Sequence, residues 1–223
     1  MFLLGGAQGA LGWYMVQSGL ANNPAVSHYR LTAHLGLAVI IFGYLLWLVT
    51  GLLMQAKQYA PNPAQSVKTA ALTCMILIAL MQISGGFMAG THAGFAYSTF
   101  PDMNGEWIPT GMLAMEPLWR NLSDNVIAIQ FAHRWTAALL VLAIAWLWLT
   151  RFQNPNSSLR VLHDAALAIA VVQFALGAAT VLSQVWIPAA LAHQMGFVCL
   201  LSVLVVLLRL SLNVRTHGMA TTR

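Results

Sequence analysis

The stretch VIAIQFAHRWTAALLVLAIAWLWL, residues 126–149, is apolar along nearly its whole length, yet it carries His133 and Arg134 side by side. A segment of about 20 mostly apolar residues is long enough to cross a bilayer as an α-helix. An ionisable side chain inside such a segment is costly, so it usually has a partner and a functional role. The stretch therefore predicts a membrane-spanning helix and raises the question of what its histidine contacts.

The composition of the whole chain extends this prediction. Of the 223 residues, 59% are hydrophobic and only 7% are charged, and the mean hydropathy is +0.73. A soluble domain carries roughly a quarter charged residues, so we expect an integral membrane protein. The net charge of +5 does not indicate nucleic-acid binding, because the basic residues are scattered along the chain. Cys74 and Cys199 lie in apolar segments without CxxC spacing and are expected to be buried free thiols.

Five further segments have a similar apolar character, which predicts about six transmembrane helices in all. The predicted helices cover residues 2–18, 31–54, 69–90, 124–149, 164–183 and 189–212. Loops rich in helix-breaking residues separate them, such as AKQYAPNPAQSVK and RFQNPNSSLR. We therefore expect an all-α integral membrane protein built from three out-and-back helical hairpins.

Most basic residues fall on one side of this arrangement. That side holds Lys57, Lys68, Arg151, Arg160, Arg209, Arg215 and Arg223. By the positive-inside rule both termini of the chain are cytoplasmic, and the long loop 91–123 faces outward. The aromatic residues of this loop suit a position at the membrane interface; they are Phe95, Tyr97, Phe100, Trp107 and Trp119.

Internal similarity links the three predicted hairpins. The first helix of each carries a Gln-x-x-x-Gly pattern, at Gln8–Gly12, Gln82–Gly86 and Gln173–Gly177. The returning helix of each carries one histidine at a similar depth: His34, His133 and His193. Glycine allows close helix approach and glutamine can bond between helices, so plain helix packing is an alternative explanation of these residues.

Three histidines at matched depth favour a ligand role. Imidazole binds haem iron, and facing helices can hold a haem between two axial histidines. Zinc and copper fit less well because no carboxylate or thiolate lies at ligand spacing, and a proton relay lacks a buried acid. His133 and His193 are the natural pair, since their hairpins form a four-helix unit; the mate of His34 would lie on a hairpin preceding Met1. The other histidines are expected to be solvated: His28, His92, His163 and His217.

Four stretches carry a family resemblance: GALGWYMVQSGL, YRLTAHLGLA, FAYSTFPDMNGEWIP and QFAHRW. Through them the chain resembles the haem A synthase family of cytochrome oxidase assembly proteins over nearly its whole length, beginning at the family's third helix. The resemblance implies an eight-helix protein of two pseudo-symmetric bundles that oxidises the methyl group of haem O to the formyl group of haem A. By position, His133 and His193 look like the axial ligands of a haem b, and His34 looks like a histidine of the catalytic, substrate-side bundle. The family's second-helix histidine and glutamate have no counterpart here.

The resemblance also implies a division of the chain. The expected parts are residues 1–54, a remnant of the substrate-side bundle; 55–68, a cytoplasmic linker; 69–212, the four-helix haem b bundle with its outward loop; and 213–223, a cytoplasmic tail. Arg134 follows a predicted ligand, and Arg30 precedes His34 by one helical turn, so both can pair with haem propionates. Snorkelling of these arginines to the interface is the alternative.

Two functions from different classes follow. The first is an oxidoreductase of haem A biosynthesis in the bacterial inner membrane, with haem O as substrate, haem A as product and haem b as cofactor. Its expected partners are the lipid bilayer, an electron acceptor, haem O synthase and a second copy of the chain. The alternative is a non-catalytic bis-histidine haem b protein that carries electrons or serves as a truncated assembly subunit. A transporter is a third and weaker hypothesis.

Overall fold

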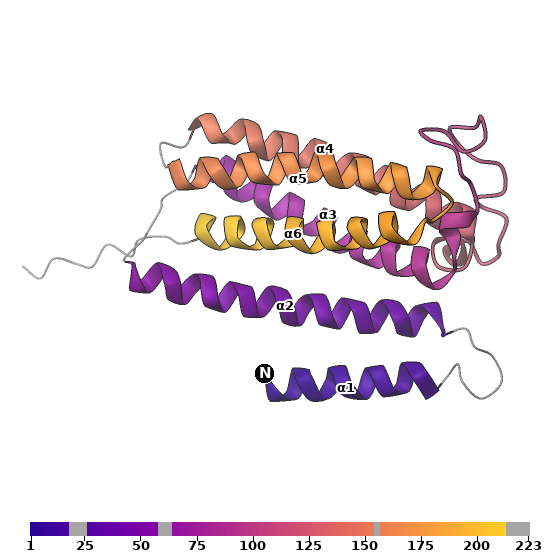
Figure 1. Ribbon diagram of the computed structural model, residues 1–223, viewed down its shortest axis with the longest axis horizontal. Coiled ribbons are helices and arrows are strands. Elements are labelled where there is room, and N and C mark those ends of the chain that lie inside the picture. Colours follow the sequence, from indigo (N-terminus) through magenta and orange to yellow (C-terminus); the bar gives the residue numbers. More distant parts are fainter. Residues whose placement is uncertain (18–25, 58–63, 154–156, 213–223) are drawn as a thin grey trace, which may run out of the picture.

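The computed structural model describes residues 1–17, 26–57, 64–153 and 157–212, and within them the secondary structure is helical (Figure 1). The long helices are α1 Phe2–Gln17, α2 His28–Ala56, α3 Gln65–Gly90, α4 Val126–Leu149, α5 Ser157–Leu182 and α6 Ile187–Ser211. Short 3₁₀ turns lie at Ala93–Phe95 (η1), Leu118–Leu122 (η2) and Thr150–Gln153 (η3). This architecture confirms the predicted all-α membrane fold.

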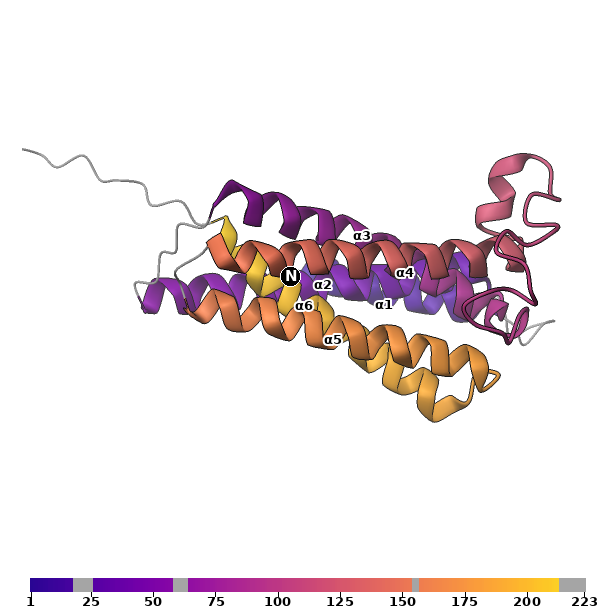
Figure 2. The ribbon, with the colours of Figure 1, turned by 90° about the horizontal axis from the view of Figure 1, so that it is seen from above.

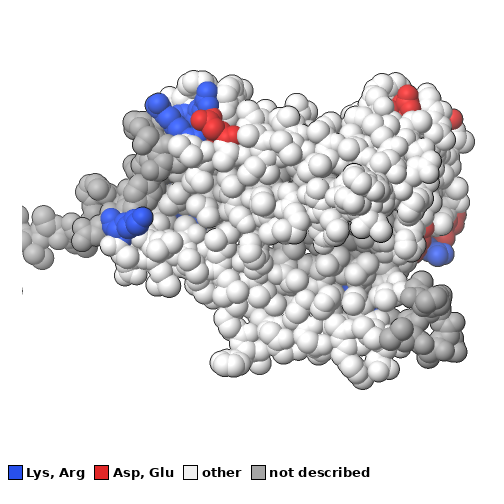
Figure 3. Space-filling model, in the orientation of Figure 1, with Lys and Arg blue, Asp and Glu red and all other residues white. Residues whose placement is uncertain are grey.

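Five of these helices, α2 to α6, are long and apolar enough to cross a membrane. The first helix, α1, has 16 residues and is shorter than the roughly 20 that a bilayer requires, although it lies where a spanning helix is predicted. Lysine, arginine and the acidic side chains gather near the two ends of the long axis, and the surface between them is almost free of charge (Figure 3). This distribution is typical of a multi-pass membrane protein.

The helices form antiparallel neighbours, as the hairpin prediction requires. The pairs α1–α2, α3–α4 and α5–α6 are in contact, and α2 also packs against α3 and α6. Among the described elements α1 touches α2 alone, and it lies at the edge of the molecule (Figure 1). The α1–α2 hairpin is therefore joined to the rest of the protein through one face of α2.

The hydrophobic core lies in the half of the bundle away from the long loop. Fully buried Ile78, Ile144 and Leu204 belong to a cluster drawn from α3, α4, α5 and α6. Toward the other end, α5 and α6 diverge from α3 and α4 (Figure 2). The bundle is thus tightly packed at one end and more open at the level where the predicted ligand histidines lie.

The segment between α3 and α4 is anchored on the open end of the bundle. Asn125 begins α4 by accepting a hydrogen bond from the Ile127 N–H at 3.0 Å, and its amide donates to the Gly111 carbonyl at 2.8 Å. The fully buried Asn121 donates to the Met115 carbonyl at 2.8 Å. These bonds hold the loop against the helix that carries His133.

Three local predictions are wrong. Cys199 is exposed, whereas Cys74 is buried as expected. His163, expected to be solvated, is fully buried beside Thr150, and His28 lies in a partly buried ion pair. Hydropathy places these residues by depth, but their exposure depends on which side of the helix meets a neighbour. His92 is exposed as expected, and His217 lies outside the described residues.

Candidate functional site

The structure brings the rings of His133 of α4 and His193 of α6 together, with an angle of 76° between their planes. Their ring centroids are 6.4 Å apart. The Nδ1 atom of His193 lies 3.1 Å from the Gln173 carbonyl oxygen, which can only accept, so Nδ1 carries the proton. The Ser84 hydroxyl lies 3.2 Å from the Met81 carbonyl and 2.9 Å from Nδ1 of His133; when it donates to Met81, its lone pair accepts from Nδ1 of His133. In the neutral rings the Nε2 atoms are then the unprotonated ones, which is the form that binds metals.

This arrangement fits an iron held between two axial imidazoles. A metal–imidazole bond of about 2 Å places the centroids of two opposing rings roughly 6 Å apart, close to the spacing found here. Within the described residues no group of three or more His, Cys, Asp or Glu side chains could hold a bare metal ion. A haem needs only the two axial positions from protein, because its porphyrin supplies the other ligands.

Small residues create the room for these rings. A Cβ atom built on Gly177 would lie 3.0 Å from Cε1 of His193, and one on Gly85 would lie 3.5 Å from Cε1 of His133. A larger residue at Gly177 would therefore press on the ring. Gly85 and Gly177 therefore belong to the site because they let the histidine rings lie against the neighbouring helix, in addition to allowing the helices to pack closely.

The hairpin α1–α2 repeats the geometry of α5–α6. His34 packs on Gly12 with the same 3.0 Å spacing that His193 has to Gly177. The Gln8 amide donates to the His34 carbonyl at 3.2 Å, as the Gln173 amide donates to the His193 carbonyl at 2.6 Å. The internal repeat found in the sequence is thus also a repeat of side-chain contacts.

The ring of His34 differs from that of His193 in its hydrogen bonds. The Gln8 amide nitrogen lies 3.3 Å from Nε2 of His34, and the buried Nδ1 atom of His34 has no hydrogen-bond partner. A ligand at Nε2 would have to displace this amide. The ring of His34 therefore lies against its glycine as that of His193 does, but its hydrogen bonds differ from those of His193.

The α3–α4 hairpin departs from the predicted Gln-x-x-x-Gly pattern. Gly86 faces Thr32 of α2, with only 2.7 Å between its built Cβ and the threonine hydroxyl. Ser84 and Gly85 are the α3 residues against His133. The sequence pattern was therefore one residue out of register for α3, because spacing along a helix does not fix its rotation toward a neighbour.

Both arginines proposed as propionate partners bind backbone carbonyls in the structure. Arg134 donates to the carbonyls of Asp102 at 2.8 Å and Tyr97 at 3.3 Å. Arg30 donates to the Tyr14 carbonyl at 3.1 Å and lies over the Tyr14 ring at 3.7 Å from its centroid. Each arginine thus holds a neighbouring segment near its histidine.

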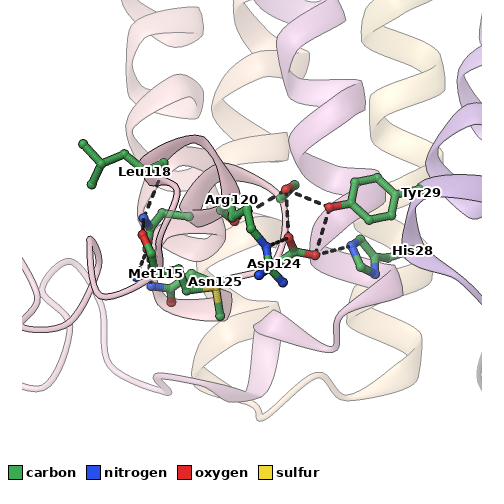
Figure 4. A network of polar contacts seen from close by, with 9 residues as sticks. His28, Tyr29, Met115, Leu118, Arg120, Asp124 and Asn125 are labelled. Atoms are coloured by element: carbon green, nitrogen blue, oxygen red, sulfur yellow. Dashed lines mark hydrogen bonds and ion pairs between the residues drawn. The ribbon is translucent and has the colours of Figure 1, made fainter.

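Sequence reasoning missed a polar cluster centred on Asp124 (Figure 4). Its carboxylate accepts from the Tyr29 hydroxyl at 2.9 Å and lies 3.2 Å from both His28 and Arg120. Burial alone would raise the pKa of Asp124, but the hydrogen bonds from Tyr29 and Arg120 outweigh it and hold that pKa below its ordinary value. The cluster ties the start of α2 to the start of α4. Only the acidic character of the loop hinted at it, since the partners are 95 residues apart.

The chain matches a known protein family and several named proteins. The COX15-CtaA family, described as cytochrome oxidase assembly protein, matches residues 1–205. A haem A synthase of Nitrosomonas eutropha is 44% identical over 203 residues, covering 90% of this chain and 57% of that protein. One from Rhodospirillum centenum is 44% identical, covering 99% of this chain and 59% of that protein. The haem A synthase COX15 of Arabidopsis thaliana is 37% identical over 218 residues, covering 93% and 48%. The chain thus spans between about half and three fifths of the length of these relatives.

Proposed function

Since this chain belongs to the COX15-CtaA family of cytochrome oxidase assembly proteins, we propose that it acts in haem A biosynthesis, oxidising the methyl group of haem O to the formyl group of haem A. The observation that carries the proposal within the structure is the opposed pair His133 and His193, with each Nδ1 atom held by Ser84 or Gln173. The relatives named haem A synthase support haem A as the product, and haem O as the substrate is part of the proposal.

In this proposal the four-helix unit α3–α6 holds a haem b. A haem bound between His133 and His193 supplies one-electron transfer. The protein contributes the fixed ring orientation, because the bonds to Ser84 and Gln173 keep both Nδ1 atoms protonated and leave Nε2 free. The surrounding apolar helices limit access of water to the site, which lowers its local dielectric constant.

The α1–α2 hairpin is proposed as part of the substrate side. His34 would bind the substrate's iron through Nε2, which requires the Gln8 amide to turn away from the ring. Gln8 would keep its bond to the His34 backbone carbonyl and so continue to fix the helix pair. Arg30, four residues before His34, holds α1 through the Tyr14 carbonyl and keeps the hairpin closed at that end.

The proposed topology places the long loop on the outer side of the membrane and the opposite end in the cytoplasm. Arg151 and Arg209 lie at the end of the helices away from the loop, which agrees with the positive-inside rule. Reporter fusions at residue 57 and within loop 91–123 test this orientation, and a cytoplasmic signal from the loop would reverse it.

The experiment for the function is haem extraction from the purified chain with reduced-minus-oxidised spectroscopy. We expect about one low-spin haem b per chain, lost in His133→Ala and His193→Ala but kept in His34→Ala. Conversion of added haem O, abolished by His34→Ala, supports the synthase assignment. If the protein binds haem b but does not convert haem O, the result supports the electron-carrier alternative. Loss of the low-spin spectrum in all three variants contradicts the pairing of His133 with His193.

A further inference from the structure

The short loop segment 97–102, which we call the strap, is held by two side chains of α4. The fully buried Gln130 donates to the Tyr97 carbonyl at 2.9 Å. Arg134 donates to the same carbonyl through Nη2 at 3.3 Å and to the Asp102 carbonyl through Nη1 at 2.8 Å. Gln130 and Arg134 are one helical turn apart and lie on either side of His133 in the sequence. Both ends of the strap are therefore fixed to the turn of α4 that carries a proposed ligand.

The middle of the strap reaches the other hairpin. The ring of Phe100 packs edge-on against Phe174 of α5, with 5.7 Å between the centroids. Phe174 directly follows Gln173, whose carbonyl accepts from Nδ1 of His193 and whose amide donates to the His193 backbone. The strap thus connects the turn bearing His133 to the turn that orients His193.

The strap is itself a folded turn. The Thr99 hydroxyl donates to the Asp102 carbonyl at 3.0 Å and accepts from the Asn104 N–H at 2.7 Å. The Asp102 carboxylate accepts from the Gly105 N–H at 3.1 Å. A turn closed by its own hydrogen bonds transmits a fixed spacing between the elements it touches, which a loose loop cannot do.

A cross-link is needed at this level because the helices diverge there. The α5–α6 hairpin moves away from α3–α4 toward the loop end (Figure 2), and the close-packed core lies toward the other end. We infer that the strap fixes the separation of His133 and His193, with Gln130 and Arg134 as its positioning residues. Both act on the site through the loop carbonyls that they bind.

This inference rests on the proposed haem site, and it assigns Arg134 a role other than pairing with a propionate. Two donor nitrogens of Arg134 already serve strap carbonyls. A propionate partner would act only on a haem with free carboxylates, whereas a strap anchor acts on any haem that the two histidines bind. The chemical difference between these roles supplies the test.

The experiment compares Arg134→Lys and Gln130→Ala with Arg120→Lys, a control arginine on the same side of the protein whose guanidinium binds Asp124. The first readout is cleavage of loop 91–123 in the haem-free full chain by a nonspecific protease. The second is the low-spin spectrum and dissociation rate of bound haem b and of its dimethyl ester. Lysine keeps the charge of Arg134 but loses the fork that reaches two carbonyls.

We expect Arg134→Lys and Gln130→Ala each to raise loop cleavage about tenfold, the effect of losing one or two partly buried hydrogen bonds. Haem should dissociate faster by a similar factor, equally for the acid and the ester, while Arg120→Lys changes both readouts by less than about twofold. Unchanged cleavage, or an effect confined to the haem with free propionates, overturns the inference.

Phe100→Leu provides a second arm if either variant fails to fold. It keeps an apolar contact with Phe174 but removes the ring packing, and we expect faster haem loss with no change in the strap's own bonds. Unchanged haem loss in Phe100→Leu contradicts the inference. A complete absence of haem in the unmodified protein would overturn the proposed function, and the cleavage comparison would still decide whether the strap is anchored as described.

Discussion

Substituting Gly177 by alanine tests the proposed site through a single methyl group. The added Cβ would lie 3.0 Å from Cε1 of His193 and 3.5 Å from its Nδ1. The ring cannot simply slide away, because Gln173 holds both its Nδ1 atom and its backbone carbonyl. Either the ring moves by a few tenths of an ångström and strains these bonds, or α5 moves away from α6.

Two opposing effects of Gly177→Ala have different magnitudes. Overpacking a fitted contact costs about 1–3 kcal/mol. Replacing glycine by alanine within a helix contributes roughly 1 kcal/mol in the other direction. In the haem-free protein the ring can yield at the expense of its bond to the Gln173 carbonyl, and the two effects nearly cancel. With haem bound the ring is fixed by the iron, so the strain persists and haem affinity falls about 10-fold to 100-fold.

The assay is titration of the haem-free chain with haem b, followed by the reduced-minus-oxidised spectrum, together with thermal unfolding of the haem-free protein. Gly12→Ala is the matched control, because the same methyl group would meet His34 with the same 3.0 Å spacing. Gly6→Ala adds a methyl group where no atom lies within 4 Å. Normal haem affinity in Gly177→Ala, or equal loss in Gly12→Ala, would refute the reasoning.

Three further results are expected. Gly90→Ala should destabilise the protein by about 1–3 kcal/mol in thermal unfolding. The added Cβ would lie 2.7 Å from the backbone Cα of His28 and push α2 away from α3. An unchanged melting temperature would argue against this close contact between the two helices. Because the pKa of Asp124 is lowered in the folded protein, this carboxylate stabilises the fold fully above pH 3.8, and the contribution is lost as the pH falls through the lower folded pKa. We therefore expect α2 to become more protease-sensitive only at strongly acidic pH. Asp124→Asn should show that sensitivity at neutral pH, with no further acid effect from this group. A small lipid-soluble thiol reagent should label the exposed Cys199 and leave the buried Cys74 unmodified in the folded protein, as mass spectrometry of each peptide would report.

The helix boundaries show what a hydropathy pattern can and cannot locate. The predicted helix at 69–90 ends with α3 at Gly90, and the one at 124–149 ends with α4 at Leu149. The predicted start at 164 is seven residues late, since α5 begins at Ser157. The first residues of α5, SSLRVLHD, are helical but include several polar side chains. Hydropathy locates the part of a helix that lies in the hydrocarbon region of the membrane and misses polar turns that extend beyond it.

The candidate site could likewise be predicted from the sequence only in part. The sequence repeat predicted which histidines share a depth, because position along a helix follows directly from residue number. It did not predict that Gly85, and not Gly86, faces His133, or that Arg134 binds the strap. Those contacts depend on the rotation of each helix about its axis and on the path of the loop before α4, whose Asp102 lies 32 residues before Arg134 in the sequence.

The sequence by itself determined that this is a helical membrane protein with a repeated hairpin and three histidines at one level, since apolar length and spacing are local properties of the chain. The tertiary structure alone decided how the rings of the predicted pair lie relative to one another, which atoms orient them and where His28, Asp124 and His163 lie. In a bundle where every helix is apolar around most of its circumference, hydrophobicity gives little preference for one rotation over another. Close glycine contacts and a few long-range hydrogen bonds therefore select the rotation, and they form only when the helices are packed.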